Sequence, residues 1–350
     1  MCVSYPVGMF YPCMSFPPIR GAPAARAVKC CLRVTVLASC LTVFHSATAV
    51  ETDTSNQAFS FAVTADPRAA GDSWRNALRE IRDMKVNPPP AFVPPSWILV
   101  AGDMDPANQR FEDYTGVFSN ALSRPPLVPV VGNHDLGVKD FSFIRDIMIP
   151  AVPRIVRREP DPCDYYFDYR NVRLVVVDAY TKNGKSGVIR KNGRDWVERV
   201  IRSAPTGIEH IFISFHEPAF PRGRHLTDSF NENARERDAF WRMLLSSCGR
   251  VRAVFVGHTH SYSRLRVRDP ESAAANNSAV FPDDEGGIYQ VDAGAAGNGK
   301  TNTFVRVQVD GKNISFRAYA AGTGLNQPFI ECDRWQLPDS NGEKKQNGQP

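Results

Sequence analysis

Short apolar runs alternate with amphipathic segments along most of the chain. Apolar residues recur at helical spacing in the segments 74–84, 111–122, 196–201 and 240–245. A final hairpin is expected around Asp310-Gly311, from Phe304–Val309 and Ile314–Tyr319. This order predicts an α/β fold with a strand meander at its end. The other runs, rich in β-branched and aromatic residues as buried strands are, cover Phe59–Thr64, Trp97–Val100, Leu127–Val131, Arg173–Val177, His210–Phe215, Val251–Val256 and Ile288–Val291.

Polar side chains that suit metal binding follow five of these strands at the point where each strand ends. Because ligands bind at the carboxyl ends of strands in α/β sheets, we expect these side chains to converge at one edge. Carboxylate, amide and imidazole groups suit Fe, Zn or Mn and do not form a thiolate site. A set this large can hold two ions about 3.5–4 Å apart, bridged by one carboxylate. The predicted ligands are Asp66, Asp103, Asn133, His216, His258 and His260.

The tetrad Gly132-Asn133-His134-Asp135 carries the most chemistry of these clusters. Asn133 offers a carbonyl oxygen, and glycine lets the backbone pass close to an ion or a phosphate. The second ring nitrogen of His134 can donate a hydrogen bond to Asp135, which would fix its tautomer. We therefore expect the tetrad to lie at the centre of the site.

Three nearby polar residues are interpreted as lying outside the site. Asp178 follows an apolar strand but is typical of a turn. His210 begins an apolar strand and is interpreted as a partly buried packing residue. His225 lies in the loop after His216, within reach of a substrate, and we expect no contact there.

Composition and charge exclude some partners. A chain of 350 residues is long enough for one large domain or two smaller ones. Its first 49 residues hold four of the 42 basic residues and none of the 37 acidic ones, which accounts for most of the net charge of +5. The remainder is near neutral, so no nucleic-acid partner or anionic membrane is expected.

The first 49 residues resemble a secretory signal. Basic residues run to Arg33, the stretch Val34–Phe44 is apolar, and Ala47-Thr48-Ala49 matches a small-x-small cleavage site. The apolar stretch is shorter than the about 20 residues of a membrane-spanning helix. A lipoprotein signal ending at Cys40 and a disordered cytosolic tail are the alternatives.

We expect cleavage after Ala49 and a secreted or periplasmic protein. The catalytic domain is predicted over residues 50–335, with a polar tail over 336–350. Five of the eight cysteines lie in the signal segment. The other three permit at most one disulfide and are interpreted as small buried apolar residues: Cys163, Cys248 and Cys332.

In their order along the chain, these motifs resemble the calcineurin-like metallophosphoesterase family. The resemblance covers about 59–322, and Ser261-Tyr262-Ser263-Arg264 is similar to the secreted, acid-phosphatase-like branch. It implies a four-layer sandwich of two mixed β-sheets with helices outside. The motifs that carry it are Asp66, Gly102-Asp103, Gly132-Asn133-His134-Asp135, His216 and Gly257-His258-Thr259-His260.

The resemblance also implies two metal ions, of Fe, Mn or Zn. Purple acid phosphatases place a tyrosine three residues after the bridging aspartate; the residue here is Pro106, so no tyrosinate–iron site is expected. The implied ligands are Asp103 as the bridge, Asp66 and His260 for the first ion, and Asn133, His216 and His258 for the second.

Catalysis is implied by the same resemblance. A hydroxide shared by the ions attacks phosphorus, and the ions neutralise the phosphate oxygens. His134, oriented by Asp135, protonates the leaving group or stabilises the transferring phosphoryl group.

Arg68 departs from the family pattern, which usually has a histidine ligand two residues after the first aspartate. A guanidinium has no lone pair for a metal. Four alternatives follow: water or Asp105 fills the gap; the first ion binds weakly; Arg68 binds the substrate phosphate; or Arg68 forms a surface ion pair.

The expected function is metal-dependent hydrolysis of a phosphate ester, with a small phosphorylated substrate or a phosphoprotein as the partner. A phosphomonoester is favoured. The alternatives are a phosphodiesterase or nuclease, and a catalytically impaired binding module motivated by Arg68. Substrate choice is expected to reside in Leu136–Arg170 and Pro218–Phe230.

Overall fold

The computed structural model describes residues 57–83, 93–121, 124–158, 161–180, 187–247, 249–275 and 286–337. The predicted signal segment, Cys248 and the chain after Leu337 lie outside these residues. Two mixed sheets with flanking helices form the described part, which confirms the predicted fold class.

The first sheet grows in both directions from the first predicted strand. β1 is parallel to β2, and β2 is parallel to β3, whereas β11 pairs with β1 in the antiparallel sense. The hairpin predicted around Asp310-Gly311 extends this sheet. Its order is β13 (Ile330–Leu337), β12 (Asn313–Ala321), β11 (Asn302–Asp310), β1 (Phe59–Thr64), β2 (Pro95–Val100) and β3 (Leu127–Pro129).

The second sheet has a parallel centre and antiparallel edges. β6, β7, β8 and β10 run parallel, so their carboxyl ends lie along one edge. Its order is β4 (Val156–Arg157), β5 (Tyr165–Tyr169), β6 (Val172–Val176), β7 (His210–Ser214), β8 (Val251–Val256), β10 (Ile288–Ala293) and β9 (Tyr262–Val267).

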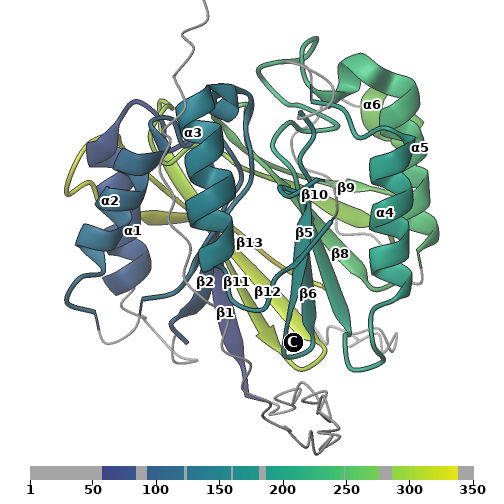
Figure 1. Ribbon diagram of the computed structural model, residues 1–350, viewed down its shortest axis with the longest axis horizontal. Coiled ribbons are helices and arrows are strands. Elements are labelled where there is room, and N and C mark those ends of the chain that lie inside the picture. Colours follow the sequence, from purple (N-terminus) through teal and green to yellow (C-terminus); the bar gives the residue numbers. More distant parts are fainter. Residues whose placement is uncertain are drawn as a thin grey trace, which may run out of the picture. The chain divides into compact units, whose positions relative to one another are not determined.

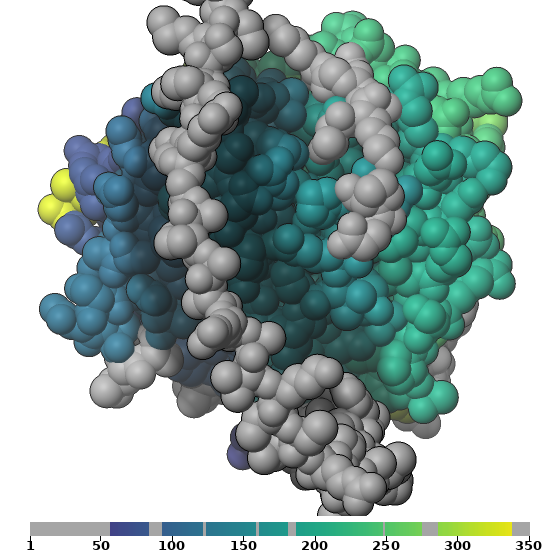
Figure 2. All heavy atoms as spheres, in the orientation of Figure 1, coloured from purple at the N-terminus to yellow at the C-terminus, as the bar shows by residue number. Residues whose placement is uncertain are grey.

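Helices cover the outer faces of the two sheets. In Figure 1, α1 and α2 lie on the side of the first sheet, and α4 and α5 lie on the side of the second. Figure 2 shows the same division: purple and blue residues, with some of the yellow C-terminal residues beside them, form one side, and green residues form the other. The helices are α1 (Gly71–Asp83), α2 (Ala107–Val117), α3 (Val138–Phe143), α4 (Lys191–Arg202), α5 (Ala234–Ser246) and α6 (Pro270–Ala275).

Aromatic side chains fill the space between the sheets. The ring of Phe61 on β1 lies 5.3 Å from that of Phe212 on β7 and 6.0 Å from that of Phe255 on β8. Trp97 on β2 meets Phe167 on β5 edge to face at 5.5 Å. Such pairs add to the stability that area burial supplies, by about 0.5–1.5 kcal/mol each. The packed interior therefore fixes the strand ends of one sheet relative to those of the other.

Four strands were not predicted: β4, β5, β9 and β13. β5 lies within Leu136–Arg170, where no strand was expected. β9 contains Arg264 and Arg266, and β13 buries Trp335 but exposes Ile330. Side-chain pairing supports them: Arg264 donates to Asp333 at 2.9 Å, joining β9 to β13. Contacts of this kind do not follow a hydrophobic period, so the sequence pattern missed them.

The interpretation of the cysteines holds for Cys163 and is wrong for Cys332. Cys163 is buried, Cys332 is exposed, and both are free thiols. Cys332 lies on β13, an edge strand whose outward positions meet solvent. Among the described residues, no helix combines the length and the apolar character that crossing a membrane requires.

Candidate active site

The predicted ligands come from both sheets and meet where the strands end. Two hydrogen bonds cross between the sheets here. The backbone N–H of His258 donates to Asp66 Oδ2 at 2.9 Å, and Nδ1–H of His216 donates to the carbonyl of Ala101 at 2.6 Å. In chain order the ligands are Asp66 after β1, Asp103 after β2, Asn133 after β3, His216 after β7, and His258 and His260 after β8.

Four of these residues have backbone angles that side chains rarely tolerate. The φ angles are 49° at Asp66, 56° at Asp103, 72° at His258 and 56° at His260. Non-glycine residues in this region cost free energy and cluster at functional sites. At Gly132 no side chain would fit, since a Cβ would overlap the Asp103 carboxylate. The strand ends are thus bent to bring polar atoms together.

The residues predicted for the second metal position, Asn133, His216 and His258 with Asp103, lie together. Asn133 Oδ1 lies 3.1 Å from His216 Nε2 and 3.2 Å from His258 Nδ1. Asp103 Oδ1 lies 3.4 Å from the same nitrogen of His216. Because Nδ1 of His216 donates to a carbonyl, the neutral ring has its lone pair on Nε2, facing two oxygen acceptors. This donor set fits a cation.

Electrostatics at this position supports the same conclusion. Burial opposes a charge on His216, but the Asp103 carboxylate outweighs it and raises the pKa of His216 to about 10. Burial likewise acts to raise the pKa of Asp103, yet the charge and hydrogen bond of His216 lower it below its ordinary value. The buried carboxylate thus requires a positive partner, which a metal ion supplies as well as a proton does.

The first metal position has fewer ligands. Ligand atoms of Asp66, Asp103 and His260 lie within 4.8 Å of one another. Asp66 Oδ1 is buried without a hydrogen bond and lies 3.3 Å from His260 Nε2. Burial raises the pKa of this carboxyl group. A buried carboxylate oxygen without a donor fits an ion, since leaving it unpaired is costly.

Asp135 does not orient His134. Its carboxylate accepts three backbone N–H bonds, from Gly132 at 2.8 Å, Asp103 at 3.0 Å and Met104 at 2.7 Å. Within the described residues this carboxylate forms no hydrogen bond with the His134 imidazole, so the predicted bond is wrong. Asp135 instead ties the loop after β2 to the loop after β3, and burial raises the pKa of its carboxyl group well above the ordinary value.

His134 lies beside Asp103, the predicted bridging ligand, and its ring is exposed. Its backbone N–H donates to Asp103 Oδ1 at 3.0 Å. Within the described residues the imidazole forms no hydrogen bond, and the residue is exposed to solvent. The ring is therefore open to a ligand that arrives from solvent.

Arg68 forms an ion pair with Asp105. Its Nε donates to Asp105 Oδ1 at 2.8 Å and its second nitrogen to Oδ2 at 3.4 Å. The side chains are 21% and 26% exposed. Of the four alternatives, this geometry corresponds to the ion pair, and Asp105 is engaged by the guanidinium.

Two residues of the loop after His216 reach the centre. The interpretation of His225 as lying outside the site is wrong, and Arg224 was not predicted. The ring of His225 lies 4.1 Å from that of His258, between centroids, and its Nδ1 lies 2.9 Å from Asp228. Arg224 donates to His260 Nδ1 at 2.9 Å. Since the loop has no periodic pattern, only its position after a ligand strand pointed to it.

Comparison with known proteins agrees with this geometry. The profile described as calcineurin-like phosphoesterase matches residues 59–262. The chain belongs to this family. It is therefore a metallophosphoesterase, a metal-dependent hydrolase of phosphate esters, and the family implies a dimetal centre. No curated protein matches the chain.

One solved structure of low identity shares the fold, and two others are similar at lower TM-scores. A purple acid phosphatase, PPD1 from yellow lupin (Lupinus luteus) seeds, superposes with a TM-score of 0.52 at 15% identity, over 79% of this chain and 54% of that one. A dimetal phosphatase from Danio rerio gives a TM-score of 0.48 at 14% identity, over 78% of this chain and 98% of that one. PhoD gives 0.48 at 10% identity, over 79% and 72%.

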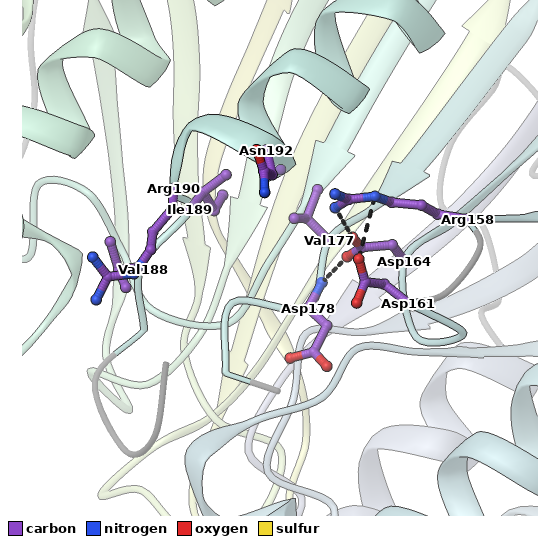
Figure 3. Close-up of a pocket in the computed structure, with 10 residues that line it drawn as sticks. Arg158, Asp161, Asp164, Val177, Asp178, Val188, Ile189, Arg190 and Asn192 are labelled. Atoms are coloured by element: carbon purple, nitrogen blue, oxygen red, sulfur yellow. Dashed lines mark hydrogen bonds and ion pairs between the residues drawn. The ribbon is translucent and has the colours of Figure 1, made fainter. Parts of the chain in front are cut away.

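A pocket adjoins the metallophosphoesterase centre, one strand further along the same sheet edge. Figure 3 shows Arg158 between two carboxylates, with Asp161 at 3.3 Å and Asp164 at 2.7 Å. Asp178, which follows β6, also lines the pocket, and its backbone N–H donates to Asp164 at 2.7 Å. The side-chain carboxylate of Asp178 accepts from the N–H of Tyr180 at 2.8 Å, as in a turn. The pocket lies partly in the region where substrate choice was expected.

Proposed function

We propose that this metallophosphoesterase is an exported phosphatase that prefers phosphomonoesters, with His134 as the general acid or as a stabiliser of the transferring phosphoryl group. The exposed imidazole beside Asp103 carries this proposal, because its ring has no hydrogen bond within the described residues. A general acid has to stand within reach of the leaving-group oxygen and retain an N–H for it.

Positive and imidazole groups around the centre favour a doubly charged phosphate. Arg224 contacts His260 and His225 contacts His258, both from the loop after β7. Bound ions supply Lewis-acid charge and lower the pKa of water. The protein's part is to hold them through Asp103 and the imidazoles, and to offer His134 to the leaving group.

A phosphodiesterase or nuclease is the second candidate. The near-neutral charge of residues 50–350 weighs against long nucleic-acid substrates, whose binding depends on many phosphate contacts. Rates on p-nitrophenyl phosphate and bis(p-nitrophenyl) phosphate separate the two candidates. A higher kcat/KM on the diester would defeat the monoester preference.

His134→Ala tests the catalytic role. We expect kcat to fall about 10²- to 10³-fold, because a general acid is lost. Bound metal should be retained, because the ring is not a predicted ligand. The loss should be larger for an alkyl phosphate than for p-nitrophenyl phosphate, since a poor leaving group depends more on protonation. Equal losses on both substrates would point to a structural role. Unchanged turnover would remove His134 from the mechanism.

Export is tested on the protein itself. We expect the mature chain, recovered from the periplasm or medium of an expressing cell, to begin at Val50. N-terminal sequencing provides the measurement. An intact Met1 on cytosolic protein would refute the proposal.

A further inference from the structure

Arg224 is an exposed residue that contacts a predicted ligand of the first metal position. One guanidinium nitrogen lies 2.9 Å from His260 Nδ1, and the other lies 3.4 Å from His225 Nε2. A guanidinium carries donors and no acceptor. Both ring nitrogens therefore accept hydrogen bonds from Arg224.

This contact decides which nitrogen of His260 bears the proton. With Nδ1 accepting from Arg224, the single N–H of a neutral ring is on Nε2. That nitrogen lies 3.3 Å from Asp66 Oδ1, an oxygen that has no other partner. The nitrogen that faces the first metal position thus carries a proton and offers no lone pair to an ion.

The second metal position has the opposite arrangement. Nδ1 of His216 meets a carbonyl, that of Ala101 at 2.6 Å, and must donate. This outer contact is therefore compatible with metal coordination through Nε2, which offers a lone pair once its own proton has left. One histidine is prepared for coordination by its outer partner, whereas the other is held in the wrong tautomer by its outer partner.

We propose that Arg224 is an internal competitor for the first metal ion. Resting on the proposed function, this assigns a regulatory role to a residue of the same site. For an ion to bind His260 Nε2, that nitrogen releases its proton, Nδ1 takes one up, and the guanidinium leaves because an N–H now faces it. The released guanidinium becomes available to a phosphate anion, so phosphate and the first ion bind cooperatively.

The surroundings allow this exchange. Arg224 is exposed, and the preceding Gly223 has a φ of 75° with open space beside it. Arg68 replaces a ligand in the family pattern, and its guanidinium pairs with Asp105 at 2.8 Å. The first position therefore lacks one ligand and meets positive charge, and the second position does neither.

Mn²⁺ titration of the metal-free full-length protein tests the proposal, with calorimetry for affinity and electron paramagnetic resonance to distinguish single from paired ions. In the wild type we expect one tightly bound ion and a second, weaker one. Arg224→Ala should tighten the weaker ion about tenfold and leave the tight ion unchanged. Arg224→Gln, which keeps an N–H donor but loses the charge, should give an intermediate value.

Arg235→Ala is the matched control, because it removes the same charge from an exposed position on α5. It should leave both affinities unchanged. A weaker ion that is unaffected by Arg224→Ala, or affected equally by Arg235→Ala, overturns the proposal. Inorganic phosphate should tighten the weaker ion more in the wild type than in Arg224→Ala, and equal tightening overturns the cooperative part.

The same titration separates this inference from the proposed function. Two ions and phosphatase turnover without an Arg224 effect would leave the phosphatase standing and remove the competitor. No bound Mn²⁺ in the wild type would defeat both.

Discussion

The two metal positions use the same kinds of side chain but differ in what supports them. At the second position, His216 is held by the carbonyl of Ala101 and faces Asn133 and Asp103. At the first, His260 is held by a guanidinium, and the remaining ligand atoms are those of Asp66 and Asp103. Outer partners set tautomer and charge, so similar ligand lists do not imply similar affinities.

The difference separates what a motif supplies from what its neighbours decide. Gly257-His258-Thr259-His260 places one imidazole at each position, only two residues apart. His258 faces Asn133 at 3.2 Å, whereas His260 lies between Arg224 and Asp66. The motif provides both rings, and loops from elsewhere in the chain determine how readily each one binds an ion.

The largest expected effects come from two single substitutions, each of which removes a histidine from one of the two metal positions. His216→Ala should weaken the tight ion by about 100-fold or more, because loss of a supporting contact alone costs 10- to 100-fold. His260→Ala should remove the weaker ion and keep the tight one. Metal content after dialysis, with a thermal unfolding check, provides the measurement. Loss of the same ion in both variants would contradict a difference in metal affinity between the two positions.

An intermediate effect is expected at Arg68. Arg68→His restores the ligand of the family pattern and removes a positive charge, so the weaker ion should bind about tenfold more tightly. Arg68→Ala removes the charge and the ion pair with Asp105 without adding a ligand, and should give a smaller gain. Mn²⁺ calorimetry distinguishes them. If the histidine variant binds no better than the alanine variant, position 68 does not face the ion.

The smallest effect is expected at a second arginine–histidine pair, which serves as a reference. Arg252 donates to His210 Nδ1 at 3.1 Å, as Arg224 does to His260, but His210 Nε2 donates to the carbonyl of Gly311 at 2.8 Å. Arg252→Ala should lower the free energy of unfolding by about 1–2 kcal/mol and leave Mn²⁺ affinity unchanged. A change in metal affinity would show that such substitutions act at long range.

The same pair predicts a pH dependence. Burial lowers the pKa of His210 below its ordinary value of 6.5, so the folded protein binds this proton less tightly than the unfolded chain does. Its contribution to stability is present above pH 6.5 and is lost as the pH falls through the lowered pKa. Urea unfolding of the wild type and His210→Gln at pH 8 and pH 5 measures it. Between pH 8 and pH 5, the free energy of unfolding should fall less in the variant than in the wild type. An equal fall in both proteins would exclude His210 as a source of this pH dependence.

Much of the fold could be predicted because its strands are buried on both faces. β1 and β8 match the predicted ranges, and the other predicted strands agree within a few residues. β13 could not be predicted, since its sequence alternates polar residues and only Trp335 is buried. β13 is positioned by its pairing with β12 and by Asp333, whose carboxylate accepts a hydrogen bond from Arg264 of the other sheet.

The site could be predicted as far as local motifs reach. Asp66, Asp103, Asn133 and the closing histidines follow strand ends, and strand ends of parallel sheets converge. The role of Asp135 could not be predicted, because its acceptors are filled by backbone groups of two different loops. The same holds for Arg224, whose partner lies 36 residues later in the chain.

By itself the sequence determined the family, the sheet-forming strands and the set of ligand types, since these follow from apolar periods and motifs a few residues long. The tertiary structure alone decided which nitrogen of each histidine faces the centre, that Arg68 pairs with Asp105, and that His225 packs against His258. Those outcomes depend on atoms within about 3–4 Å that come from distant segments, and side-chain hydrogen bonding between them has no period for a sequence to display.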